Sequence, residues 1–556
     1  MNELRAVGML IRIAPGLAAV ACALLVADAL LPNLVIVVMG HATGRIPAAV
    51  QDGLNSASGH ALERALALAG VVYTLSLLRA PAQSALSGIV RGRLTPTIQN
   101  RMVDAVSRPV GVSHLEDPLV ADRLASVSGE LRGDRLADAP MTVLAQWGDR
   151  LGGAFSCVVL MTFRVWVGVL LLVVWLAVRR PSRAFVVSRV NTFRRAALPL
   201  RQAGYLLRLA SGGAAAKEVR VFEQGEWLTS RFRERWLTAM RPSWADLRRI
   251  QIRTAAIALV VLAAYLAAAW EVAEHADLRT LATMLPMLPM SMQLGSVSAL
   301  EVQLAGMLAG LPDLDALERD LHSQDQEWTA SEAIRFEDVH FAYTDAEVLK
   351  GIDLVLESGT SLALVGLNGA GKTTLVALLS RLYEPTRGRI TGVADQREVA
   401  LVGQDALRLP LTAAENVAMG RPIDRAALDR AAERAGMRPL DWDTVLSARY
   451  PGGVDLSGGE WQRLTLARAL YAVDHGARVL VLDEPTAHLD VRAEVAFHDR
   501  FLELVHGTTC IVISHRFSTV RRADRIAVLA DGVIAELGSH EELMALGGEY
   551  ARMFAA

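Results

Sequence analysis

The chain has 556 residues, too many for one hydrophobic core, so we expect two or three domains. Hydrophobic residues make up 52% of it and the mean hydropathy is +0.30, which predicts membrane-spanning segments. The net charge of −2 at pH 7 gives no reason to expect a nucleic-acid partner, and three scattered cysteines exclude a disulfide framework or a cysteine-based metal site.

Long apolar runs separated by arginine-rich stretches fill the chain up to about residue 310. A membrane-spanning helix needs roughly 20 mostly apolar residues. Arg164 interrupts one long apolar run, so we expect a short outer turn there between two neighbouring spans. The first apolar run has no evident signal-peptide cleavage site, so we expect it to be retained as a membrane anchor. We predict six spans, at about residues 15–39, 61–79, 141–160, 162–178, 252–274 and 281–309.

The distribution of arginine predicts the orientation of the spans. Residues 80–140 and 179–251 are rich in arginine, whereas the loops around 40–60 and 275–280 hold few. Because positively charged loops stay in the cytoplasm, we expect both rich stretches and both termini there. These stretches are too long for simple loops, so we expect helices that extend well beyond the bilayer. The expected location is the cell membrane, among its lipids.

A few ionisable side chains fall within the predicted spans, namely Asp28, Glu271 and Glu301. Such residues could bind substrate or couple its movement, or they could lie at an interface or face the helix bundle. The Met- and Pro-rich segment 284–292 is either an adaptable pocket or a proline-broken span packed by methionine. The sequence leaves these alternatives open.

The composition changes near residue 310. We therefore divide the chain into a six-span membrane domain (1–310), a polar, acidic linker (311–332) and an α/β domain (333–556).

The α/β domain contains a phosphate-binding loop, G-x-x-x-x-G-K-T, from Gly366 to Thr373. It lies between a strand-like run (361–365) and a helix-like run (374–382), which is the context that such a loop requires. Backbone N–H groups would point at phosphate oxygens, Lys372 would hold the β- and γ-phosphates, and the Thr373 hydroxyl would bind magnesium. A chance match is the alternative, but only three of the 57 basic residues are lysines.

Two further segments carry candidate chemistry. The apolar strand 479–482 ends in Asp483, placed to hold magnesium, and Glu484, placed to polarise a water molecule. Ser457-Gly458-Gly459 opens a long helix and offers a second anion-binding N-terminus. Two phosphate-facing surfaces in one domain make sense if two copies pack head to tail, so that each closes the other's ATP.

In order, these motifs resemble those of ATP-binding cassette (ABC) transporters of the half-transporter exporter type. The resemblance implies a membrane all-α six-helix domain followed by an α/β P-loop NTPase domain, with ATP and Mg²⁺ as cofactors. It also implies roles for individual residues. Tyr343 would stack on adenine, Gln404 would sense magnesium, the loop 487–490 would cross the dimer interface, and His515 would contact the γ-phosphate.

The implied site residues fall into three groups. The catalytic groups are Glu484, His515 and Lys372. Magnesium would be held by Thr373, Gln404 and Asp483. The nucleotide-binding residues are Tyr343, Gly366, Asn368, Gly369, Gly371, Lys372, Thr373, Thr374, Gln404, Ser457, Gly458 and Gly459.

The chain departs from the family pattern at two positions. Glu460 replaces the usual glutamine, and we expect its side chain to point away from the phosphates with little effect. His488 stands where a small residue is usual, as a surface contact or as a titratable group at the interface. Residues 113–118 and 216–222 resemble the two coupling segments of exporters, although a solvated helical hairpin would look similar.

The function implied by the resemblance is ATP-driven export by a homodimer. Alternatives are import through the same architecture, pairing with a sister half-transporter, and a mechanical or regulatory ATPase without transport. Because the first span begins about 15 residues into the chain, we expect no N-terminal peptidase domain before it, and so no cleavage of a leader peptide by this chain. The cargo is open among peptides, natural products, lipids and drugs, with a small peptide or natural product of the same cell favoured.

Overall fold

The computed structural model describes residues 2–128, 135–195, 197–212, 215–295, 299–321, 331–403, 407–484, 507–514 and 516–555. The chain forms two compact units. The first comprises Met1–Arg108 and Leu115–His322, and the second comprises Pro109–His114 and Ser323–Ala556.

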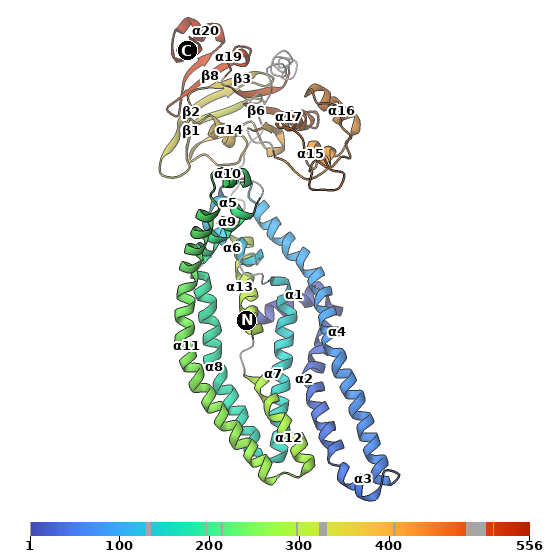
Figure 1. The fold of residues 1–556 in the computed structure, drawn as a ribbon. Coiled ribbons are helices and arrows are strands. Elements are labelled where there is room, and N and C mark those ends of the chain that lie inside the picture. The colour runs from blue at the N-terminus through green and yellow to red at the C-terminus, as the bar shows by residue number, and fades with distance from the viewer. Residues whose placement is uncertain are drawn as a thin grey trace. The chain divides into compact units, whose positions relative to one another are not determined.

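The first unit is helical (Figure 1). Its elements in chain order are α1 (Asn2–Ile13), α2 (Pro15–Thr43), α3 (Ile46–Asp52), α4 (Ala57–Ser107), α6 (Pro118–Ser128), η1 (Leu136–Asp138), α7 (Ala139–Phe163), α8 (Val165–Arg195), α9 (Ala197–Ser211), α10 (Ala216–Val221), α11 (Gly225–His275), α12 (Leu278–Met290), η2 (Ser291–Leu294) and α13 (Ala299–Asp320). The short helix α5 (Ser113–Glu116) begins in the second unit and ends in the first.

Within the described residues, three helical segments are long and apolar enough to cross a membrane: Pro15–Asp52, Ala57–Ser107 and Ala255–His275. They contain the predicted spans 15–39 and 61–79 and nearly all of 252–274. The predicted spans 141–160 and 162–178 fall on α7 and α8, which meet at the extended residue Arg164, as the short-turn prediction requires.

The predicted span 281–309 is wrong as a single helix. Helix α12 contains Pro286 and Pro289 and ends at Met290, a 3₁₀ turn follows, and the next described helix is α13 (Ala299–Asp320). Proline removes a backbone donor and clashes with the preceding turn, which accounts for the break. The proline-broken interpretation of 284–292 therefore holds, with Met287 fully buried.

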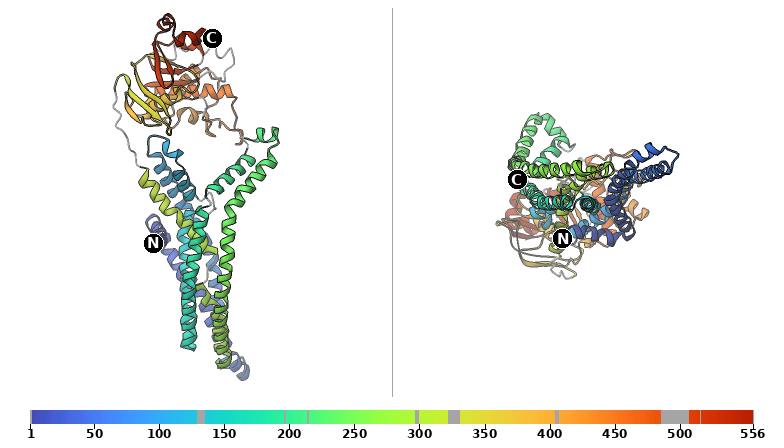
Figure 2. Two further views of the ribbon diagram at one scale, coloured as in Figure 1. Left: turned by 90° about the vertical axis from the view of Figure 1, so that its left-hand side faces the viewer. Right: turned by 90° about the horizontal axis from the view of Figure 1, so that it is seen from below.

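Helices α4 and α11 have 51 residues each, and Figure 2 shows α11 and α8 as long rods of the first unit. At about 1.5 Å per residue, 51 residues span roughly 77 Å, whereas the bilayer core is about 30 Å thick. These helices are therefore much longer than a bilayer core is thick. The C-terminal part of α4 is held against α13 by Arg101, which donates two hydrogen bonds of 2.7 Å to Glu318.

Each acidic residue noted in the predicted spans is paired with an arginine from another part of the bundle. Asp28 lies 3.1 Å from Arg79, and Glu301 lies 2.7 Å from Arg150. Glu271 lies 3.2 Å from Arg164 at the α7–α8 turn. The pairing accounts for how these charges are accommodated among apolar helices.

The second unit contains two sheets. A three-stranded antiparallel sheet has the order β2-β1-β4, and a six-stranded sheet has the order β5-β6-β7-β3-β8-β9, parallel except for β9. Every residue of β3, β6 and β7 is buried, because helices cover both faces of a parallel sheet. The strands are β1 (Ile334–Ala342), β2 (Glu347–Leu356), β3 (Ser361–Val365), β4 (Arg387–Thr391), β5 (Val399–Val402), β6 (Val479–Asp483), β7 (Thr509–Ile513), β8 (Arg525–Ala530) and β9 (Val533–Gly538).

Helices complete the second unit. They are α14 (Lys372–Leu379), η3 (Gln396–Glu398), α15 (Ala413–Ala418), α16 (Arg425–Arg434), α17 (Gly458–Asp474), α19 (Phe517–Val520), α20 (His540–Leu546) and α21 (Glu549–Ala555). Two hydrophobic cores result, one built around Trp461 and Tyr471 of α17 and the other around Phe336 of β1 and Leu375 of α14.

The connection after α4 also belongs to the second unit. The backbone N–H of Val112 donates to the carbonyl of Leu382 (2.8 Å), and the Gln396 amide donates to the carbonyl of Val110 (2.8 Å). A side chain at Gly111 would lie 2.9 Å from the Leu382 carbonyl oxygen, so glycine permits this close approach.

Candidate nucleotide site

The glycine loop joins β3 to α14, as the motif predicts. The predicted strand 361–365 is confirmed, and the helix starts at Lys372, two residues earlier than predicted. Gly366, Gly369 and Gly371 have φ angles of 150°, 86° and 104°. A Cβ at Gly366 would collide with the carbonyl of Leu529, so the loop can take this path only with glycine.

Lys372 turns its ammonium group into the loop. Its Nζ donates to the carbonyls of Gly366 (2.7 Å) and Leu367 (3.0 Å), and the residue is only 8% exposed. Burial lowers the pKa of the Lys372 amine, while Glu484 and Asp483 act in the opposite direction. The ammonium is thus held by neutral carbonyls, which phosphate oxygens would replace with stronger charge-assisted bonds.

Asp483 and Glu484 stand at the carboxyl end of β6, beside the end of β7. Asp483 is buried, and the Glu484 backbone N–H donates to the carbonyl of Ile513 (2.9 Å). Glu484 has a φ of 49°, an uncommon backbone conformation for a residue with a side chain. The glycine loop follows β3 at the same edge of the parallel sheet, which is where such sheets bind ligands.

The threonines at the start of α14 differ in environment. Thr373 is exposed, whereas Thr374 is buried and its hydroxyl lies 3.2 Å from that of Tyr343. The Tyr343 ring stands edge-on to those of Phe341 and Tyr383, at centroid distances of 4.8 and 5.3 Å. Tyr343 is 50% exposed, so part of the ring is open to a stacking partner beside the phosphate loop.

Asn368, in the glycine loop, is exposed. Gln404, His515 and the loop 487–490 with His488 lie outside the described residues.

Ser457 is the N-cap of α17, and Glu460 completes a reciprocal capping box with it. The Glu460 carboxylate accepts from the Ser457 hydroxyl (2.7 Å) and backbone N–H (2.9 Å). The expectation that Glu460 points away from the phosphates stays a prediction, and the structure adds that its carboxylate folds back onto Ser457. The pattern S-x-x-E predicts this capping box, and reading it would have found the contact.

Sequence reasoning also missed a half-buried arginine in this unit. Arg468 of α17 donates to the carbonyls of Asn416 (2.8 Å) and Leu407 (3.1 Å), which connects α17 to α15 and to the segment before it. Nothing in its spacing distinguishes Arg468 from the many surface arginines of this chain.

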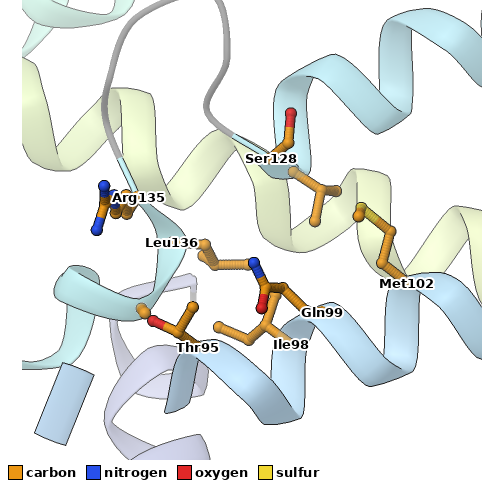
Figure 3. A pocket seen from close by; sticks show the side chains of 9 residues that line it. Thr95, Ile98, Gln99, Met102, Ser128, Arg135 and Leu136 are labelled. Carbon is orange, nitrogen blue, oxygen red and sulfur yellow. The ribbon is translucent and has the colours of Figure 1, made fainter. Parts of the chain in front are cut away.

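The first unit has a separate cavity of about 340 Å³ between α4, the end of α6 and η1 (Figure 3). Its lining includes the apolar residues Ile98, Met102 and Leu136 and the polar residues Gln99 and Arg135. The buried hydroxyl of Thr95 has no hydrogen-bond partner among the described residues. The described residues that line this cavity form no catalytic arrangement.

Known proteins resemble this chain in two ways. Residues 349–487 match the family described as ABC transporter. ABC transporter B family member 28 of Arabidopsis thaliana is 43% identical over 239 residues, which is 39% of this chain and 33% of that protein. The ATP-dependent lipid A-core flippase of Chromohalobacter salexigens is 42% identical over 239 residues, 40% of each chain. The matches thus span well under two thirds of these relatives.

A solved structure extends the likeness to the whole chain. The structure of a bacterial Atm1-family ABC exporter with ATP bound has a TM-score of 0.74 and 22% sequence identity. The alignment covers 98% of this chain and 99% of that one. At this identity the likeness shows the fold.

Proposed function

We propose that this chain, an ABC transporter with the half-transporter fold of an exporter, couples ATP hydrolysis to export across the cytoplasmic membrane. The observation that carries the proposal is the meeting of three charged groups at one sheet edge. Lys372 lies inside the glycine loop that follows β3, and Asp483 and Glu484 stand at the carboxyl end of β6 at the same edge of the sheet. This arrangement suits a nucleoside triphosphate better than any other ligand class.

Each residue has a distinct task in the proposed reaction. The glycine loop and Lys372 bind the phosphates, and Tyr343 takes the adenine on its open face. Magnesium, which would neutralise charge on the transferring phosphate, fits the hard oxygen donors of Thr373 and Asp483. Glu484 accepts a proton from the water molecule that attacks the γ-phosphate. The protein thus accelerates phosphate transfer by positioning the reacting groups and by electrostatic stabilisation.

The helix start at Ser457 supports a dimer. The backbone N–H groups of Gly458 and Gly459, in the first turn of α17, have no acceptor within the helix, and the helix dipole is favourable there, so this helix start is a second place for phosphate in the same domain. In a head-to-tail pair, each ATP lies between the glycine loop of one chain and this helix start of its partner. Two equivalent sites then form across a two-fold axis.

Transport follows if closure of the ATP site moves the helices. Residues 109–114 and the α10 region are the candidate coupling segments, and both flank long helices of the first unit. The cargo is a peptide, natural product, lipid or drug. The lipid A-core flippases among the relatives give lipids a specific reason for inclusion.

Proteoliposomes test the proposal. ATP added outside the vesicles reaches only chains whose nucleotide domains face outward, and candidate lipids, peptides and drugs are screened for stimulated ATPase activity. Export predicts ATP-dependent accumulation of the stimulating cargo in the lumen. Depletion from preloaded vesicles would instead establish import. Undiminished ATPase activity without flux in either direction would favour a non-transporting ATPase, and native mass would reveal a sister subunit.

A further inference from the structure

A groove between α9 and α11 carries charged and aromatic side chains that the proposed ATP cycle does not use. It has a volume of about 670 Å³ and lies wholly within the first unit. The two helices pack through Ala203, Leu228 and Ala239, which are almost fully buried. The groove is lined by Arg201, Gln202, Tyr205, Leu206, Trp227, Arg231 and Arg235.

The charges in the groove are incompletely neutralised. Arg201 is paired with Asp122 of α6 (2.6 Å), and Arg231 is paired with Glu234 (2.9 Å). Arg235 has no ion pair among the described side chains. Three guanidinium groups thus face two carboxylates, one of them, Glu234, itself well exposed, so the groove is electropositive.

Aromatic rings form the remainder of the lining. Tyr205 and Trp227 are 58% and 51% exposed, unusually open for such large rings. The Arg231 guanidinium lies over the Trp227 ring at 5.8 Å from its centroid, which holds the ring and a cation together. Guanidinium groups bind carboxylate or phosphate in a planar fork, and exposed indole or phenol rings stack on planar molecules.

An aromatic belt at a membrane surface does not explain the groove. The apolar segment of α11 begins at Ala255. Trp227 lies roughly 40 Å earlier along the helix, at about 1.5 Å per residue. Lipid headgroups extend only several ångströms beyond the roughly 30 Å hydrocarbon core, so a soluble ligand fits this position better.

We propose that this groove binds a planar aromatic anion. Its ring lies against Trp227 and Tyr205, and its phosphate or carboxylate group is held by Arg235 and Arg231. Because α9 and α11 flank α10, a bound ligand joins the helices on either side of that segment. The proposal stands on the groove alone and does not depend on the proposed function.

The experiment uses the full-length chain in detergent, with saturating MgADP to keep the probe out of the glycine loop. The probe is 2-naphthyl phosphate, and binding is measured by calorimetry. We expect saturable binding that is stronger than that of 2-naphthol, which lacks the anion, or of inorganic phosphate, which lacks the ring. Arg235→Ala and Trp227→Ala should each weaken it roughly three- to tenfold, and Trp227→Phe should restore part of the loss.

Matched controls lie on the same helix. Arg233→Ala removes the same charge and Trp244→Ala the same ring, outside the groove lining. Both should leave the affinity unchanged, and the elution profile of each variant checks folding. The proposal is overturned if the wild-type chain shows no saturable binding, if 2-naphthol binds as well as its phosphate, or if Arg233→Ala weakens binding as much as Arg235→Ala.

Discussion

The Glu460 carboxylate is hydrogen-bonded to Ser457, whose hydroxyl donates over 2.7 Å and whose backbone N–H donates over 2.9 Å. Those bonds, the hydroxyl foremost, lower the pKa of Glu460, so it stays ionised at neutral pH. The same reciprocal arrangement joins Thr412 to Glu415 and Ser539 to Glu542. Of these, only Glu460 stands at the helix start proposed to meet the partner's ATP.

Glu460→Gln should therefore tighten ATP binding. Glutamine preserves the capping bonds and removes a negative charge from the phosphate-facing helix start. We expect the KM for ATP in steady-state ATPase assays to fall about two- to fivefold, with a smaller change at high salt. Glu542→Gln and Glu415→Gln make the same chemical change elsewhere and should not alter KM. An equal shift in all these variants would attribute the effect to helix capping.

Glu484→Gln should stop turnover while leaving ATP bound. Loss of the general base is worth roughly 10²–10⁴-fold in rate. We expect ATPase activity to fall at least about 100-fold and native mass to shift to the dimer in MgATP. Glu541→Gln, an exposed glutamate on α20, is the control. Wild-type ATPase activity in Glu484→Gln would show that Glu484 is not the general base. Failure of both variants to dimerise in MgATP would contradict an ATP site shared between two chains.

Lys372→Arg should abolish tight nucleotide binding. The compact ammonium fits between the carbonyls of Gly366 and Leu367 in a nearly closed loop, whereas a planar guanidinium needs more room and a different geometry. ATP affinity, measured by calorimetry, should fall more than about tenfold, the cost of one lost charge-assisted bond. Lys350→Arg makes the same exchange at an exposed position of β2 and should have no effect.

The β1–β2 hairpin should loosen in alkaline solution. His340 lies between Glu347 (Nδ1 to Oε1, 2.6 Å) and Asp338 (Nε2 to Oδ1, 3.1 Å), and these bonds, Glu347 first, raise its pKa above the ordinary 6.5. Arg387 also faces Asp338. A raised folded-state pKa gives stability that is full below pH 6.5 and is lost as pH rises through the folded value.

Hydrogen exchange of β1 and β2 in the full chain measures this loss. Exchange, corrected for its intrinsic pH dependence, should become faster above neutral pH in the wild type. In His340→Gln it should be fast throughout and independent of this titration. A pH-independent wild type would show that the His340 pairing does not stabilise the hairpin.

The glycine loop between β3 and α14 could be predicted from the sequence, because the geometry of such a loop depends on local residue types. The contact of Glu460 with Ser457 was not predicted, because the family comparison drew attention to phosphate, whereas the local capping pattern determines the side chain's direction. The hydroxyl contact between Tyr343 and Thr374 and the pairing of Asp28 with Arg79 join distant elements. These contacts depend on how the elements are rotated against one another, which cannot be predicted from the local sequence pattern of either element.

The backbone itself passes repeatedly between the two units, because residues 109–114 belong to the second unit and the chain on either side of them to the first. The second unit is therefore joined covalently to α4, to α6 and, through its own start, to α13. An excised fragment starting at residue 323 would expose the Leu382 carbonyl and the Gln396 amide that the 109–114 strap now covers.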